Sequence, residues 1–307
     1  MTNITKICCM LIALTSIVVN ASETKSFPNL QGPWFGQETP GLIAEPFAPA
    51  TVSIDGRYEF GVSFSQDLTE MYFTTLDIIE GVDTDPQIYY SKVENNIWTK
   101  PERANFTKSK MAYELTPHAS LNENRVYFTG RKPGSKDSGV WYVIPTKSGF
   151  SEAKRYELPY NDGRLSDMNQ GLNGDLIFTN MSERKMYYAE NKNGEFLTPK
   201  PMDIEFGIHG YISPNEDYLL VNAPNKDNQD RKDHDIFVYF KEKNGSWSKP
   251  LNLGLAVNTH HTESVARITP DGKFLFFGRY NEPSGASNIY WVSTQVIHEL
   301  KKQYFSK

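Results

Sequence analysis

A short polar turn followed by a strongly apolar segment occurs five times along the chain. The copies are FSQDLTEMYFTT (64–75), ASLNENRVYFTG (119–130), QGLNGDLIFTN (170–180), ISPNEDYLLVN (212–222) and ITPDGKFLFFG (268–278). Alternating or continuous apolar residues on either side of such a turn predict two strands of a hairpin. Because the unit recurs over nearly the whole chain, it predicts a repeat architecture.

Each copy continues into an aromatic segment, such as QIYYSKV after the first or NIYWVST after the fifth, and four copies lead to a further turn and short strand. The unit is therefore a four-stranded antiparallel meander. Its second strand, as in FLFF (274–277), is apolar on both faces and must be covered on both sides. These features predict an all-β fold, a single β-propeller of five four-stranded blades, with six blades as the alternative.

The fifth copy lacks a fourth strand, because the segment QVIHELKKQYFSK that follows it predicts a short amphipathic helix. The prolines that end two of the other fourth strands, Pro101 and Pro250, stand at a fixed distance before a glutamate of the next repeat. Pro46 stands at the same distance before Glu59. We therefore expect the N-terminal segment to supply the outer strand of the last blade and close the ring.

The chain begins with one lysine, an apolar run at 7–19 and the small-residue site Val19-Asn20-Ala21, a pattern typical of a signal peptide. The expected layout is a signal peptide (1–21), an N-terminal segment with the closing strand (22–57), the repeats (58–294) and a C-terminal helix or tail (295–307). We expect a periplasmic or secreted protein, with an uncleaved N-terminal anchor as the alternative. Cys8 and Cys9 would leave with the signal, which excludes disulfides, zinc–thiolate sites and cysteine nucleophiles in the mature chain.

The amino-acid composition excludes only a few classes of binding partner. The net charge is −5 and there is no basic stripe, so nucleic acid is not expected as a partner. No later segment has the roughly 18 apolar residues of a spanning helix, so no stable membrane span is expected. We expect a monomer that binds a peptide, protein or glycan.

The turn patterns SPNEDYLLV and TPDGKFLFF, each followed by an aromatic strand such as DIF or NIYW, resemble the TolB-type, WD-like β-propeller repeats. The resemblance covers nearly the whole mature chain. It implies a propeller and an exported protein, but the roles of such families range from interaction modules to peptidase propellers and polysaccharide lyases, so it does not imply one function.

Counted back from the repeat anchors (Ser65, Ser120, Gly171, Ser213 and Thr269), the position six residues earlier is a glutamate in three copies: Glu59, Glu114 and Glu263. Strict strand alternation would put the position two residues before the anchor on the same face. That position holds Ser63, His118, Asn169, Tyr211 and Arg267. We expect a polar ring at one end of the channel, with Glu59, Glu114, His118, His209, Tyr211, Glu263 and Arg267 as candidate ligand-binding residues.

The hairpin geometry brings Glu114 near Arg131 and Glu263 near Arg279, which predicts two structural ion pairs. Leu76 stands opposite Glu59, so Glu59 is expected to lack such a partner. The alternative is that all three glutamates only tie blades together.

Other candidates are weaker. His118, His209, His260 and His261 lie on or just before inner strands, where a divalent metal is conceivable, but no metal or other cofactor is predicted. The oxygen-rich run at 225–235 lacks the glycine of a calcium loop. Trp34 and Phe35 precede the repeats, where they could contact a ligand or cover an end of the ring.

The function expected from the sequence is a non-catalytic module that recognises its ligand at the channel mouth. The alternative is a sugar-active enzyme, either a glycoside hydrolase or a polysaccharide lyase, that uses carboxylates and histidines at that mouth. No nucleophile elbow, phosphate loop or dinucleotide fingerprint is present.

Overall fold

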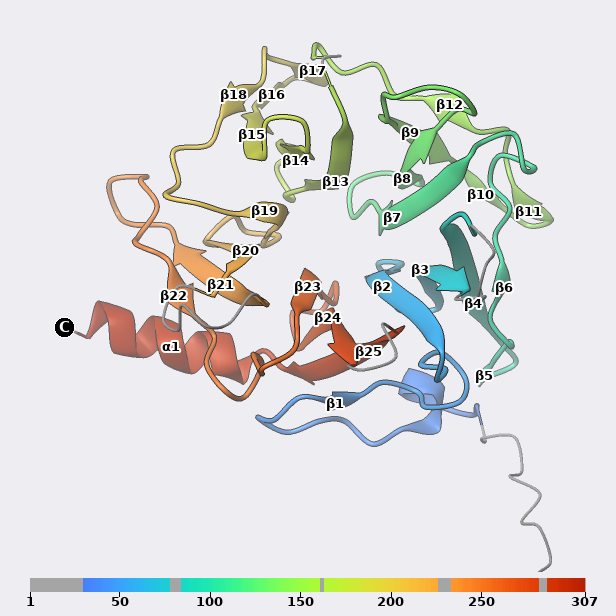
Figure 1. Cartoon of the computed structure of the whole chain (residues 1–307), viewed down its shortest axis with the longest axis horizontal. Helices are drawn as coiled ribbons and strands as arrows, with labels where there is room; N and C mark the ends of the chain where they lie inside the picture. Colours follow the sequence, from blue (N-terminus) through green and yellow to red (C-terminus); the bar gives the residue numbers. More distant parts are fainter. Residues whose placement is uncertain (1–29, 78–83, 161–162, 226–232, 282–285, 307) are drawn as a thin grey trace, which may run out of the picture.

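The computed structural model describes residues 30–77, 84–160, 163–225, 233–281 and 286–306. The predicted signal peptide and most of the oxygen-rich run lie outside these ranges. Four-stranded sheets surround a central axis, and each places one strand near that axis (Figure 1). The chain is therefore an all-β propeller, as the repeats predict. Each sheet is named here after its inner strand.

The sheets follow one another in chain order. The β2 sheet contains β2 (Arg57–Phe64), β3 (Glu70–Asp77), β4 (Gln87–Glu94) and β6 (Glu102–Arg103). The β7 sheet contains β7 (Tyr113–Ala119), β8 (Val126–Arg131), β9 (Gly139–Val143) and β12 (Lys154–Arg155). The β13 sheet contains β13 (Leu165–Gln170), β14 (Leu176–Asn180), β15 (Lys185–Ala189) and β18 (Lys200–Pro201). The β19 sheet contains β19 (Ile208–Ile212), β20 (Tyr218–Pro224), β21 (His234–Phe240) and β22 (Leu251–Asn252). The β23 sheet contains β23 (Glu263–Ile268), β24 (Phe274–Asn281), β25 (Ala286–Ser293) and β1 (Glu45–Pro46). One parallel bridge, between Tyr58 and Ser287, joins the β23 sheet to the β2 sheet.

Shorter strands and two helical elements lie outside these four-stranded sheets. β5 (Ile97–Trp98) pairs with β4, while β10 (Pro145–Thr146) with β11 (Gly149–Phe150) and β16 (Asn191–Lys192) with β17 (Glu195–Phe196) form two short hairpins. The helical elements are a 3-10 turn, η1 (Pro33–Gly36), and α1 (Gln295–Phe305). α1 is the helix expected at the C terminus. Among the described residues, no helix has the length and apolar character needed to cross a membrane.

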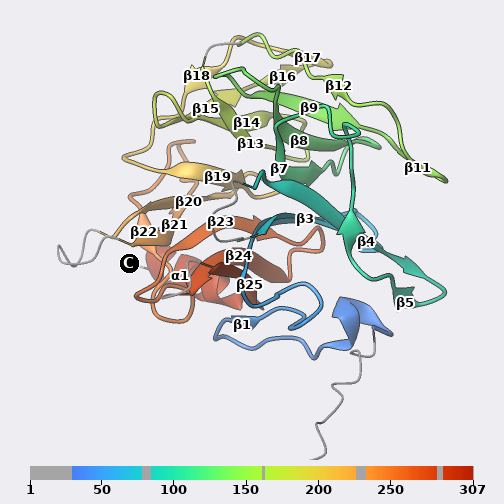
Figure 2. The same ribbon diagram turned by 45° about the vertical axis from the view of Figure 1, so that its right-hand side comes forward.

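The N-terminal segment completes the last sheet. Glu45 pairs with Trp291 and Pro46 with Tyr290, so β1 is the outer strand that the fifth repeat lacks. The N- and C-terminal parts of the propeller thus lie side by side (Figures 1 and 2). This is the pairing expected from the position of Pro46, and it joins distant parts of the chain without a disulfide.

Apolar side chains fill the spaces between neighbouring sheets. Between the β23 and β2 sheets, Phe47 and Trp291 are fully buried against Phe276. Trp34 and Phe35 belong to the same cluster, and Phe35 stacks on Trp98 at 4.5 Å. These two aromatic residues are therefore part of the core and are not available to a ligand.

Every inner strand contains a β-bulge at the same place, four residues before its anchor. The strand registers shift there, and the residue at that position has a positive φ in all five strands: Gly61, Thr116, Asp167, His209 and Val265. A bulge inserts one residue and reverses the alternation of side chains beyond it. Glycine adopts this backbone conformation at little cost, whereas β-branched residues adopt it only with strain, so Thr116 and Val265 are strained positions close to the axis.

Candidate active site

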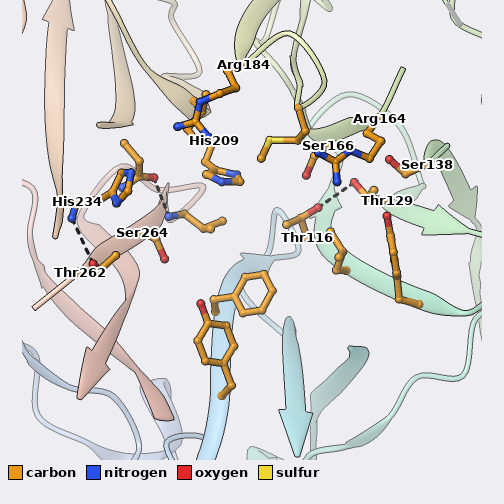
Figure 3. A pocket seen from close by; sticks show the side chains of 18 of the residues that line it. Thr116, Thr129, Ser138, Arg164, Ser166, Arg184, His209, His234, Thr262 and Ser264 are labelled. Atoms are coloured by element: carbon orange, nitrogen blue, oxygen red, sulfur yellow. Dashed lines mark hydrogen bonds between the residues drawn. The ribbon is translucent and has the colours of Figure 1, made fainter. Parts of the chain in front are cut away.

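A cavity of about 480 Å³ opens at one end of the central channel (Figure 3). All five inner strands contribute the residue five positions before their anchor, namely Phe60, Leu115, Ser166, Ile208 and Ser264. Four repeats also contribute the residue seven positions before the anchor: Tyr58, Tyr113, Arg164 and Thr262. The wall therefore combines aromatic rings with hydroxyl groups, which suits the faces and edges of a sugar ring.

The ionisable groups in the cavity wall are mainly basic. Arg164, Arg184, His209 and His234 line it, whereas no described residue of the lining is an aspartate or glutamate. Burial, together with the charges of Arg184 and His209, lowers the pKa of His234. The three groups are thus close enough to repel one another when charged, and a bound anion would relieve that repulsion.

His209 is held by a carboxylate beneath the cavity floor. Its Nδ1 lies 2.5 Å from Oδ2 of Asp167, on the neighbouring β13 strand, and Asp167 is completely buried. Burial alone would raise the pKa of Asp167, but the charges of His209 and Arg267 and hydrogen bonds from His209 and Ser166 outweigh it and lower this pKa to about 2. Asp167 is therefore ionised and fixes a proton on His209 Nδ1, which leaves Nε2 free to accept a proton from a ligand.

The bulges explain why His209 faces the cavity. The backbone N–H of His209 donates to Oγ1 of Thr179 at 3.0 Å, and the N–H of Thr116 donates in the same way to Thr74. These bonds across neighbouring sheets hold the positive-φ residues in place. They offset part of the strain that the bulge introduces.

Three of the residues proposed from the sequence lie near His209, but deeper. Arg267 is buried and its Nη2 lies 3.4 Å from Oδ1 of Asp167, while the Tyr211 hydroxyl donates to the Ile268 carbonyl at 3.4 Å. Burial and the charge of Arg267 lower the pKa of His118 to about 3. Of the seven candidates, His209 is therefore the one whose side chain reaches the cavity wall.

The three glutamates lie outside the cavity lining. Each is almost fully buried and accepts a hydrogen bond from a backbone N–H of the loop that enters its inner strand: Glu59 from Ile54, Glu114 from Thr107 and Glu263 from Thr259. Their shared position thus reflects a shared structural contact. The side chains at this position point away from the channel because the bulge reverses the strand alternation assumed from the sequence.

One predicted ion pair is present and two expectations are wrong. Glu263 and Arg279 lie directly opposite each other, with Nε and Oε1 2.8 Å apart. Arg131 lies opposite Tyr113 instead of Glu114, and its guanidinium stacks over the Tyr113 ring. Glu59 does not lack a partner, since Arg57 on its own strand binds it at 2.7 Å. A cation can thus come from the same strand as well as from the opposite one.

The described histidines do not form a metal centre. Within those residues, no group of three or more His, Cys, Asp or Glu side chains is placed to hold a metal ion. His118 and His209 belong to different layers of the channel, and the rings of His260 and His261 lie against each other at a 40° tilt with centroids 4.0 Å apart.

Arg164, Asp167, Arg184 and His234 were missed from the sequence. Asp167 could have been found, because it occupies the same repeat position as His209. Arg184 is the last residue of a four-residue turn and has a positive φ. Its approach to His209 depends on the curvature of the ring, so no sequence spacing indicates it.

A second cavity of about 510 Å³ adjoins the first between the β13 and β19 sheets. The two cavities share Arg184, Ile208 and Asn222 in their walls. Apolar side chains such as Met202 and Ile204 line the second cavity together with Glu183 and Glu205. The two cavities are therefore neighbours with a common wall.

Comparison with solved structures supports the fold. No family model matches the chain, and a search of curated proteins gave no match. An α-L-arabinofuranosidase from Podospora anserina in complex with cellotriose is similar, with 10% identity, a TM-score of 0.50 and coverage of 83% of this chain and 95% of that one. A thermostable family-43 glycoside hydrolase has 13% identity, a TM-score of 0.50 and coverage of 78% and 92%. An exo-β-1,3-galactanase from Clostridium thermocellum has 10% identity, a TM-score of 0.51 and coverage of 81% and 62%.

These comparisons correct the function expected from the sequence. The similar structures are glycoside hydrolases, which favours the sugar-active alternative over a non-catalytic binding module. At this level of identity the likeness is one of fold, so no residue role is carried over. The TolB-type resemblance likewise gains support only for the propeller architecture.

Proposed function

We propose that the protein is an exported, five-bladed propeller enzyme that acts on anionic saccharides and cleaves them by β-elimination. The observation that carries the proposal is the composition of the channel-mouth cavity. It combines a carboxylate-held histidine, His209, with arginines on its rim and has no carboxylate among its described lining residues.

That composition favours elimination over hydrolysis. Glycoside hydrolases commonly use two carboxyl groups about 5 to 10 Å apart, one on each side of the bond that breaks. The buried Asp167 faces His209 and Arg267, and Glu59, Glu114 and Glu263 bind loop amides outside the cavity. The described part of the cavity therefore offers a base and positive charge, but no pair of acids.

β-Elimination needs a base and a positive charge, and the cavity contains both. In a uronate, the proton on C5 is acidified when a cation neutralises the adjacent carboxylate, and Arg184 or Arg164 can supply that charge. Nε2 of His209 takes the C5 proton, the electron pair forms the C4–C5 double bond, and the C4–O bond breaks. The resulting imidazolium, stabilised by Asp167, returns the proton to the leaving oxygen. No water is consumed.

The adjoining cavity supports an oligosaccharide as the substrate. Two neighbouring cavities of about 480 and 510 Å³ together exceed the needs of one sugar ring, and Arg184 belongs to the walls of both. A chain bound across both would place one charged unit beside Arg184 and His209 and its neighbours against the apolar wall.

A screen of the purified protein against matched acidic and neutral oligosaccharides tests the proposal. Uronate-containing substrates should yield products with the ultraviolet absorbance of a conjugated double bond, and neutral ones should give none. His209→Gln should abolish the product, while the outward-facing His298→Gln on α1 serves as the matched control. Cleavage of neutral sugars without that absorbance would refute elimination.

A further inference from the structure

The channel contains a polar ring one layer below the active-site cavity. The ring consists of the residues two positions before each repeat anchor: Ser63, His118, Asn169, Tyr211 and Arg267. All five are at most 9% exposed. Polar side chains at such depth are expected to be hydrogen bonded.

Three members of the ring bond to the next sheet. Ser63 Oγ accepts the N–H of Ala119 at 2.9 Å, Asn169 Oδ1 accepts that of Ile212 at 3.0 Å, and the Tyr211 hydroxyl donates to the Ile268 carbonyl. His118 and Arg267 depart from this pattern. Nε2 of His118 and Nε of Arg267 are both buried without a hydrogen-bond partner in the described part of the chain.

The unpaired groups come from sheets that flank the β2 sheet. Arg267 lies on β23 and His118 on β7, and β2, which carries Ser63, runs between those strands at the centre of Figure 1. The Ser63 hydroxyl accepts a backbone N–H, and none of the described residues accepts its own hydrogen. Ser63 Oγ binds the N–H of Ala119, the residue next to His118, and β2 contacts both β7 and β23, so Arg267, Ser63 and His118 are consecutive members of the ring.

The donor set selects the charge of a ligand. In the tautomer with its proton on Nε2, the neutral imidazole of His118 donates one N–H; the guanidinium Nε–H is always protonated, and the serine hydroxyl can donate as well. Asp167 is the carboxylate bound to Arg267, and it already accepts from His209 and Ser166. A cation would meet the fixed positive charge of Arg267, whereas an anion would satisfy the three donors.

We propose that the channel binds a small inorganic anion of the halide class between Arg267, Ser63 and His118. The site is separate from the sugar-binding cavity and does not depend on the proposed reaction. Its ligand stabilises the ring by pairing the two buried nitrogens and completes the contact between the first, second and last sheets.

Crystals of the intact mature protein grown in bromide give the direct test. Anomalous density should appear within hydrogen-bond distance of His118 Nε2 and Arg267 Nε. In halide-free buffer of equal ionic strength, added chloride should raise the melting temperature in a saturable way, by roughly 2 to 4 °C.

Two variants separate this site from a general salt effect. His118→Phe removes one donor at similar volume and should raise the chloride concentration for half of the melting shift by about tenfold or more. His298→Phe, on the exposed face of α1, makes the same substitution away from the ring and should leave that concentration unchanged. Absence of anomalous density, or equal melting temperatures with chloride and with a non-halide salt, would show that only water fills the ring and would overturn the proposal.

Discussion

Nδ1 of His209 lies 2.5 Å from Oδ2 of Asp167, and the two residues occupy the same bulge position on neighbouring inner strands. The bulge turns one side chain toward the cavity and keeps the other beneath it. A carboxylate that orients an imidazole in this way also stabilises the imidazolium formed when Nε2 takes a proton. This pair therefore links the geometry of the repeat to the proposed chemistry.

Replacing Asp167 and replacing His209 should affect stability and activity differently. Asp167→Asn leaves Arg267 buried without its counter-charge and should lower the free energy of unfolding by about 3–5 kcal/mol. His209→Gln removes a side chain that is 25% exposed and should cost much less stability while abolishing activity. Denaturant unfolding combined with product assays checks both. Equal losses of stability would contradict the assigned roles.

The bulge at Val265 should reverse the usual order of alanine and glycine. Val265 has a φ of 53°, where a side chain with a Cβ costs about 1–2 kcal/mol relative to glycine. Val265→Gly should therefore be less destabilising than Val265→Ala. At Val238, buried in the regular strand β21, the glycine variant should instead be the worse of the two. Thermal melts of these four variants test the prediction, and the same order at both sites would show that the bulge is not strained.

Ring closure depends on the segment around β1. Phe47 is fully buried against Phe35, Phe276 and Trp291, so Phe47→Ala should destabilise the protein by about 3–5 kcal/mol. Ile43, in the same segment, is 75% exposed, and Ile43→Ala should have little effect. Denaturant melts provide the comparison. If both variants unfold together with the unchanged protein, the segment does not hold the ring closed.

Glu59 should make stability depend on pH. Burial raises its pKa to about 8, although the Arg57 guanidinium opposes this shift. Because the folded-state pKa lies above the unfolded-state value, the stabilisation is fully present below about pH 4.5 and is lost as the pH rises through about 8. Unfolding free energies measured across this range should fall for the unchanged protein, by at most about 1.4 kcal/mol per pH unit, relative to Glu59→Gln. Parallel profiles would show that Glu59 is already ionised throughout.

The repeat made the fold predictable, because both faces of each second strand are apolar and only stacked sheets can cover them. The same periodicity misled the choice of site residues. Strict alternation placed Glu59, Glu114 and Glu263 on the channel face, whereas a single inserted residue in each inner strand turns them outward. A bulge is a backbone feature, and Thr116 or Val265 gives no sequence signal for a positive φ.

Cavity residues that lie outside the repeated positions were harder still to predict from the sequence. Arg184 and His234 reach the cavity from a turn and from the start of β21, where the sequence shows only polar residues near a strand. His209 was proposed from its place on an inner strand, whereas Asp167 was missed although it occupies the same repeat position, because the contact between the two joins different sheets. Their contact follows from the stacking of sheets around the axis.

Oxygen transfer from solvent tests elimination at the His209 cavity most directly. The protein should be incubated with a uronate oligosaccharide in water enriched in heavy oxygen, and the products weighed by mass spectrometry. The account predicts an unsaturated product that is lighter than the hydrolysis product by one water and carries no solvent oxygen at the broken bond, and it predicts no product with His209→Gln. Products that are all saturated, with a summed mass one water above that of the substrate, would show hydrolysis and contradict it.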